Sequence, residues 1–169
     1  MHISFVGSLL VDQLLNEDAP EEQKKEVADF IAKHCALAEQ LGFHLGASGF
    51  KVKVGSFSEL DSAFCRGVVS GIHKKGGSPR EYVRQLVGGF TNQQYLHEEV
   101  AHQRMPSEDD FIEGKSAFFD KCNALILIGG HHYAKMLGAW AINKGIPVFP
   151  LPLMNGFASH ELWQHLASR

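Results

Sequence analysis

The sequence has few cysteines, no paired cysteine motif and no long hydrophobic run. Its three cysteines are Cys35, Cys65 and Cys122, and none is spaced as CxxC. An odd number of widely separated thiols is typical of a reduced, cytosolic protein rather than of a secreted disulfide scaffold. We therefore expect a cytoplasmic protein in which the cysteines act as small buried apolar residues.

The chain also lacks an excess of basic charge. It carries 16 Lys and Arg against 19 Asp and Glu, which gives a formal net charge of −3. Nucleic acids and anionic membranes are bound by dense basic faces, so we expect neither as a partner. Residues 1–12 have no basic stretch ahead of their short apolar run, which predicts neither a signal peptide nor a membrane span.

The sequence contains enough hydrophobic residues to form one core. Of the 169 residues, 44% are hydrophobic, and a chain of this length buries roughly 70% of the surface that it exposes when unfolded. Stability then requires no disulfide, metal or cofactor. We expect a single domain over residues 1–169, with no cofactor.

Short apolar stretches alternate along the chain with longer stretches of helical periodicity. The expected strands are 3–7, 43–46, 82–87, 124–128 and 146–151. The expected helices are 20–41, 56–71, 107–122, 132–144 and 159–166. This alternation predicts an α/β fold, a Rossmann-like parallel sheet with helices on both faces. Between residues 73 and 106 the sequence predicts no element other than the strand at 82–87.

Glycines and small polar residues follow the expected strands. In an open parallel sheet, ligands bind outside the carboxyl ends of the strands, where loops and helix N-termini present amides to anions. Four turns therefore predict a phosphate or ribose cradle, with the ligand-binding candidates Gly7, Ser8, Ser48, Gly49, Gly55, Ser56, Gly129, Gly130, Asn155 and Gly156. Every α/β fold needs small residues at such turns, so a structural role for each pair stays open.

Charged and aromatic residues near these turns are further ligand candidates. His131 and His132 follow the glycines at an expected helix start, where an imidazole could donate to a phosphate or transfer a proton. Arg66 could reach a phosphate, and Tyr133 could stack on a base. Solvation or packing would explain each of them equally well.

Carboxylates near the second turn are the weak catalytic candidates. A glycosidase or a nucleoside deoxyribosyltransferase needs a carboxylate close to the anomeric carbon, and Asp61 and Glu59 are the nearest ones. Ser56 and Glu59 also have capping-box spacing, so helix capping is the simpler role. Arg80 and Arg84 could contact a phosphate in the segment that the sequence describes least.

One apparent metal motif fails on spacing. The run HEEVAH places His97 and His102 five residues apart. On a helix this spacing turns the two imidazoles roughly 140° apart, whereas a zinc-binding HExxH pair shares one face. We expect no metal site.

Three segments together resemble one superfamily. They are LGASGFKVKVGSFSELDSAFCRGVVSGI at 45–72, NALILIGGHHYAKMLGAWAINKGIPVFPLP at 123–152 and MNGFASHELWQHL at 154–166. The first two resemble the SLOG superfamily, which includes the LOG phosphoribohydrolases. The third is similar to the end of the sensor SLOG domain of Thoeris-type antiphage effectors. The resemblance implies a nucleotide-binding domain in antiphage defence whose small-molecule ligand is ADP-ribose or a cyclic ADP-ribose isomer.

The chain departs from the enzymatic branch of that superfamily in the motif after the long apolar strand. LOG enzymes carry PGGxGTxxE, whereas this chain reads IGGHHYAKM over 128–136, with Tyr133 in place of the threonine and Met136 in place of the glutamate. A thioether cannot carry a proton. We therefore expect a sensor or sequestering protein, forming a homo-oligomer, rather than an enzyme. The alternatives are an N-glycosidase or deoxyribosyltransferase using other acidic or imidazole groups, and a protein-interaction subunit with a vestigial pocket.

Overall fold

The computed structural model describes residues 1–9, 19–88, 91, 93–105, 116–152 and 158–168. Its elements, in chain order, are β1 His2–Ser8, α2 Glu21–Ala47, β2 Lys51–Val54, α3 Glu59–Lys74, α4 Pro79–Tyr82, β3 Val83–Val87, the 3₁₀ turn η1 Gln93–Tyr95, β4 Ala101–Arg104, β5 Ala124–Gly129, α6 His132–Asn143, β6 Val148–Leu151 and α7 Ala158–Ala167. Residues 116–119 are also helical.

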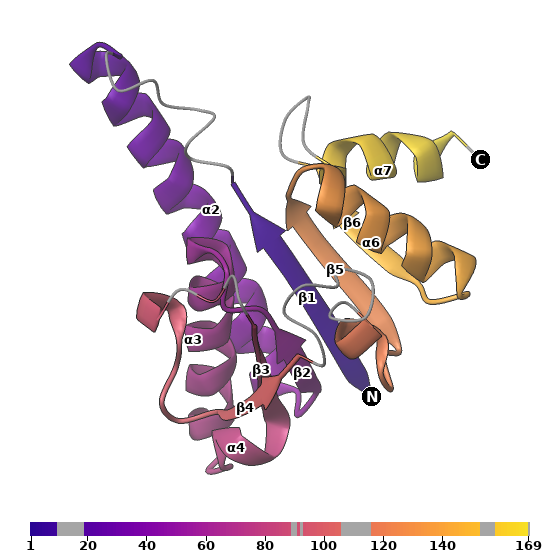
Figure 1. The fold of residues 1–169 in the computed structure, drawn as a ribbon. Coiled ribbons are helices and arrows are strands. Elements are labelled where there is room, and N and C mark those ends of the chain that lie inside the picture. The colour runs from indigo at the N-terminus through magenta and orange to yellow at the C-terminus, as the bar shows by residue number, and fades with distance from the viewer. Residues whose placement is uncertain (10–18, 89–90, 92, 106–115, 153–157, 169) are drawn as a thin grey trace.

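The strands form one sheet in the order β4-β3-β2-β1-β5-β6 (Figure 1). Every neighbouring pair is parallel, and β5 lies between β1 and the edge strand β6 with all of its residues buried. Continuous apolar runs such as Ala124–Gly129 are typical of strands that are covered on both faces. The predicted α/β fold with a Rossmann-like parallel sheet is confirmed.

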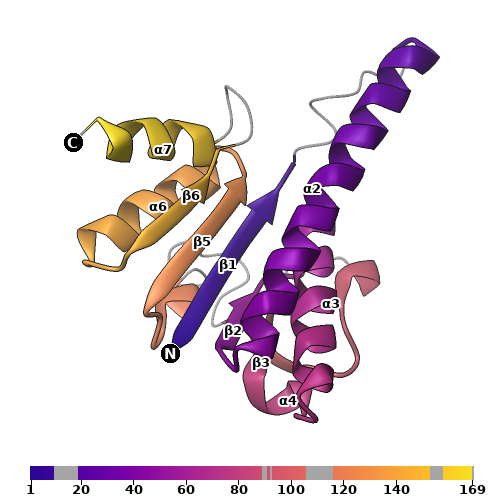
Figure 2. The same cartoon turned by 180° about the vertical axis from the view of Figure 1, so that it is seen from behind.

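Helices cover both faces of this sheet (Figures 1 and 2). On one face, Phe5 stacks on Phe64 of α3 with ring centroids 3.9 Å apart, in the largest apolar cluster. On the other face, Leu127 of β5 contacts α6 and α7 in a second cluster with Ala134 and Leu162. Successive strand residues point to opposite faces, so β5 contributes to both cores.

The expected strand at residues 43–46 is wrong, because α2 runs without a break to Ala47. Gly42 does not end the helix. A Cβ at Gly42 would lie 2.3 Å from the carbonyl oxygen of Phe64, so glycine is required there for contact with α3. The second strand is Lys51–Val54, which follows Ser48 and Gly49 instead of preceding them.

Other element boundaries also shift. Ser58, not Ser56, is the N-cap of α3, and its hydroxyl accepts from the amide of Asp61 at 3.1 Å. The strand predicted at 82–87 is present as β3, whereas β4 was not predicted. The start of the helix predicted at 107–122 lies outside the described residues, and within the described part residues 116–119 are helical.

No helix in the described part of the chain is both long and apolar enough to cross a membrane.

Candidate functional site at the carboxyl edge of β1 and β5

The order of the strands puts a topological switch point between β1 and β5. From β1 the chain adds β2, β3 and β4 on one side, and then returns to place β5 and β6 on the other. The connections that leave β1 and β5 therefore diverge to opposite faces, and such a crevice is where open α/β sheets bind ligands. Ser8 and Gly129 are register partners at this edge.

The carboxyl end of β5 and the residue that follows it both need to be glycine. Gly129 and Gly130 have φ angles of 64° and 83°, in the left-handed region that disfavours other residues. A Cβ on Gly130 would also lie 2.3 Å from that of Ala134. The amide of Gly129 donates to Ser159 Oγ at 2.9 Å, and the amide of Gly130 donates to the carbonyl of Ser8 at 2.6 Å. These glycines therefore join β1, β5 and α7 and determine the backbone path at this edge of the sheet.

The first turn of α6 follows directly from the glycines. His131 is the N-cap, and its Nδ1 accepts from the amide of Tyr133 at 3.2 Å. This assigns Nδ1 an acceptor role and puts any proton of the neutral ring on Nε2. His132 and Tyr133 are exposed, and their rings lie 5.9 Å apart. The turn therefore offers imidazole and phenol groups beside the positive end of a helix dipole.

On the β1 side, Gly7 is bound to the start of α3. Its amide donates to Asp61 Oδ1 at 3.3 Å, and its carbonyl accepts from the Ser58 hydroxyl at 2.6 Å. Asp61 Oδ2 also accepts from the amide of Phe57 at 3.2 Å. Both carboxyl oxygens of Asp61 thus hold backbone amides, and Gly7 has both of its backbone polar groups occupied.

Burial dominates the ionisation of Asp61. The residue is 2% exposed, and this desolvation raises the pKa of its carboxyl to about 7, against the lowering effect of the hydrogen bonds from Phe57 and Gly7. A carboxyl in such a position is partly protonated near neutral pH. Its role in the structure is to anchor the turns after β1 and β2.

Gly55 and Ser56 follow β2 at the same edge. A Cβ at Gly55 would lie 2.6 Å from Asp61 Oδ2, so glycine lets the strand end pass close to that carboxyl. The Ser56 hydroxyl donates to the carbonyl of Leu86 at 2.8 Å and lies 3.0 Å from the hydroxyl of Thr91. Both residues therefore bind neighbouring turns to one another.

Other sequence-predicted residues lie elsewhere. Ser48 and Gly49 precede β2, so they are at the amino edge of the sheet and not in the crevice. Arg66 lies two turns into α3 and contacts Glu39 of α2 at 3.3 Å. Glu59 is exposed on the first turn of α3, near the carboxyl edge.

The two further arginines lie on α4 and β3. Arg80 donates to the carbonyl of Glu98 at 3.4 Å, and Arg84 donates to the carbonyl of Arg80 at 2.5 Å. Asn155 and Gly156 lie outside the described residues. Of the predicted candidates, the structure brings together Gly7, Ser8, Gly55, Ser56, Glu59, Asp61, Gly129, Gly130, His131 and His132.

Among the described residues, no group of three or more His, Cys, Asp or Glu could hold a metal ion. His97 and His102 are not on a shared helix, because residue 97 precedes β4 and residue 102 lies within it. The ring of His102 contacts the carbonyl of His97 at 3.1 Å.

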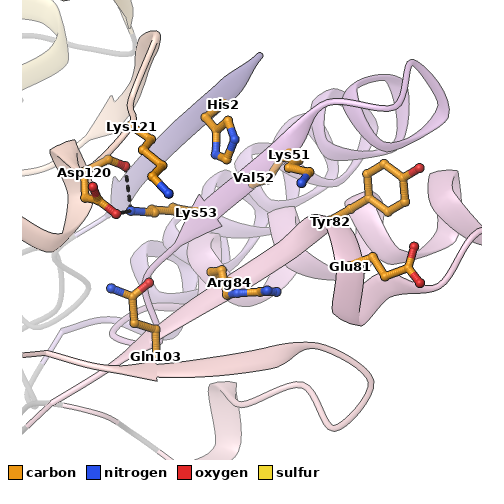
Figure 3. A pocket seen from close by; sticks show the side chains of 10 residues that line it. All are labelled: His2, Lys51, Val52, Lys53, Glu81, Tyr82, Arg84, Gln103, Asp120 and Lys121. Atoms are coloured by element: carbon orange, nitrogen blue, oxygen red, sulfur yellow. Dashed lines mark hydrogen bonds and ion pairs between the residues drawn. The ribbon is translucent and has the colours of Figure 1, made fainter.

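The structure also has a cavity that sequence reasoning missed. It has a volume of about 240 Å³ and lies at the amino ends of β1 and β2, away from the crevice (Figure 3). Its basic residues are dispersed along the sequence, and only strand pairing brings them together. The available signal was the alternation Lys51-Val52-Lys53-Val54, which puts two lysines on one face of a strand.

No protein-family model matches the chain, and a search of the curated proteins finds no match. The SLOG resemblance therefore depends on the residues quoted above and stays a prediction.

Proposed function

We propose that this protein binds an ADP-ribose-type nucleotide in the crevice between the carboxyl ends of β1 and β5. The observation that carries the proposal is the switch point itself, with a two-glycine turn leading into the first turn of α6. Helix N-termini at such points favour anionic groups through the helix dipole. The SLOG resemblance narrows the anion to ADP-ribose or a cyclic ADP-ribose isomer.

The residues at the crevice favour holding such a ligand over cleaving it. Met136 is 42% exposed on α6 where the resemblance places the glutamate of the enzymes. Asp61, the other candidate, uses both carboxyl oxygens on backbone amides. On this proposal the protein is a sensor or a sequestering protein, and in antiphage defence the ligand is the signal.

His132 is the residue to change in a binding test. Gly130 is unsuitable, because its positive φ and the approach of Ala134 make any side chain disruptive to the fold. His132 is exposed on the first turn of α6, so its loss removes an imidazole without opening the core. His44 is an exposed histidine at the far end of α2 and provides the matched control.

We expect calorimetric titration with ADP-ribose to show at least a fivefold weaker affinity for His132→Ala than for the wild type. His44→Ala should match the wild type. After incubation and heat denaturation, chromatography should return the ligand intact. Release of free adenine, lost in Glu59→Gln, would instead assign a glycosidase or transferase. Absence of binding across ADP-ribose and its cyclic isomers would contradict the proposal and favour the interaction subunit.

A further inference from the structure

The cavity at the amino edge is built from the four neighbouring strands β1 to β4, the short helix α4 and the segment before β5. Figure 3 shows the side chains of β1, β2 and β3 together on one face of the sheet, with Asp120 and Lys121 forming a wall beside them. Its lining residues are His2, Lys51, Val52, Lys53, Glu81, Tyr82, Arg84, Gln103, Asp120 and Lys121. Basic side chains predominate among them.

One of these basic side chains, that of Lys53, is already paired with groups of the protein itself. Lys53 is 6% exposed, and its ammonium donates to the carbonyls of Ala117 and Asp120 at 2.9 and 2.7 Å. The Asp120 carboxylate lies 3.4 Å away and offsets its charge. This contact holds the wall of the cavity against β2, and leaves Lys51, Arg84 and Lys121 against the single carboxylate of Glu81. The cavity therefore has an excess of two positive charges.

Arg84 is held in place on this face. Its Nη1 donates to the carbonyls of Arg80 and Val83 at 2.5 and 3.1 Å. A guanidinium fixed by backbone carbonyls loses less rotational freedom when it binds an anion than a mobile one does. Neutral donors, the hydroxyl of Tyr82 and the amide of Gln103, lie in the same lining.

Lys121 has an unusual backbone for its residue type. Its φ of 57° makes it the one non-glycine residue with a positive φ in the part of the chain that the structure describes. Such a conformation is costly for a lysine and persists where the surrounding structure enforces it. Its side chain lines the cavity (Figure 3). The unfavourable φ therefore belongs to a residue whose ammonium group faces the cavity.

The ionisation of His2 reports the same positive potential. Burial lowers the pKa of its imidazole, and the nearby charges of Lys51, Lys53 and Lys121 lower it further. An anion in the cavity would offset this repulsion. The volume of about 240 Å³ is below the roughly 300–1,000 Å³ of drug-sized ligand sites, so the occupant is smaller than a dinucleotide.

We propose that this cavity is a second ligand site, which binds a small phosphate-bearing anion through Lys51, Arg84 and Lys121. The excess of two positive charges matches a phosphate dianion, and fixed guanidinium groups suit phosphate oxygens. β1 spans His2 to Ser8, so the cavity lies about 20 Å from the crevice at the rise expected for a strand. The site is therefore independent of the proposed nucleotide function.

The test is a titration of ¹⁵N-labelled protein with inorganic phosphate and with ribose 5-phosphate, at constant ionic strength. We expect saturable shifts of the backbone amide signals of Lys51, Lys53 and Arg84, and none at Gly129 or Gly130. Equal affinity for both probes would show that the phosphate group alone accounts for binding. Tighter binding of ribose 5-phosphate would identify the ligand as a phosphomonoester. Ribose alone should produce no shift.

Two variants separate an anion site from a merely structural cluster. Lys51→Met and Lys121→Gly should each weaken phosphate binding at least tenfold, while Lys25→Met, an exposed lysine on α2, should leave it unchanged. Lys121→Gly should also keep or raise the melting temperature, because glycine accepts a positive φ without strain. Shifts that do not saturate, or affinities unchanged in both cavity variants, would overturn the proposal.

Discussion

Asp61 shows how one buried carboxyl determines local geometry. It holds the amides of Gly7 and Phe57 at the ends of β1 and β2, where the proposed ligand crevice begins. Its full burial disfavours the charged form, so folding raises the pKa of this carboxyl from an ordinary 3.8 to about 7. The folded state therefore binds more protons than the unfolded state between these two values, and stability from this group is lost as pH rises.

We predict that the Asp61→Asn variant loses this pH dependence. From pH 5 to pH 8 the unfolding free energy of the wild type should fall by about 2 to 3 kcal/mol relative to the variant. Asparagine cannot titrate, although its NH₂ faces an amide donor and lowers stability at every pH. Urea denaturation at a series of pH values measures the difference. Glu59→Gln, an exposed carboxyl on the same turn, should follow the wild type, and parallel curves for wild type and Asp61→Asn would refute the assignment.

At the scale of elements, α2 and α3 approach each other more closely than side chains allow. Gly42 and Gly46 of α2 face α3, and Gly67 and Gly71 of α3 face α2. A Cβ at Gly67 would lie 1.9 Å from the carbonyl oxygen of Glu39, and one at Gly71 would lie 2.2 Å from that of Phe43. The neighbouring atoms are backbone and cannot rotate away, so the pair depends on the absence of side chains.

We predict that Gly67→Ala destabilises the protein by about 2 kcal/mol or more, because overpacking forces the helices apart. Helix propensity alone predicts the opposite effect, because replacing Gly by Ala inside a helix raises stability by roughly 1 kcal/mol. Ser70→Ala, at an exposed position of the same helix, tests propensity without the contact and should be neutral or slightly stabilising. Chemical denaturation of both variants measures the change in the free energy of unfolding. A Gly67→Ala variant more stable than the wild type would contradict the close approach of the two helices.

At the scale of the whole molecule, the β1–β5 ladder joins two halves. One contains β2, β3 and β4 with α2 and α3, and the other contains β6 with α6 and α7. On the proposed function, a ligand at the carboxyl ends of β1 and β5 would contact turns from both halves and stabilise their association. The expected homo-oligomer stays a prediction, which light scattering of the purified protein would check.

We predict that ADP-ribose raises the melting temperature by about 5 to 10 °C at a hundred times its dissociation constant. The physical reason is mass action, since a ligand that binds only the folded state adds about 2.7 kcal/mol at that concentration. ATP should give a much smaller shift, because the proposed site spans two ribose-phosphate units and not a triphosphate. Thermal denaturation followed by circular dichroism measures both, and equal shifts would contradict the proposed selectivity.

The sequence by itself determined the class of fold and the two strands, β1 and β5, that meet at the switch point. Residues 3–7 and 124–128 are short apolar runs. The first ends in Gly7 and the second is followed by Gly129 and Gly130, and this pattern suits buried parallel strands whatever the rest of the chain does. The two glycines after β5 and the helix that follows them were also predictable, because backbone conformation and capping are local properties.

Tertiary structure decided what depends on distant partners. Gly42 reads locally as a helix end, yet it lies inside α2 because the backbone of α3 occupies the space of its missing side chain. β4 is polar and short, and it is a strand because β3 pairs with it. The basic cavity joins residues 2, 51, 84 and 121, which only the sheet register and the wall before β5 bring together. Local patterns specify elements, and long-range contacts specify which side chains meet.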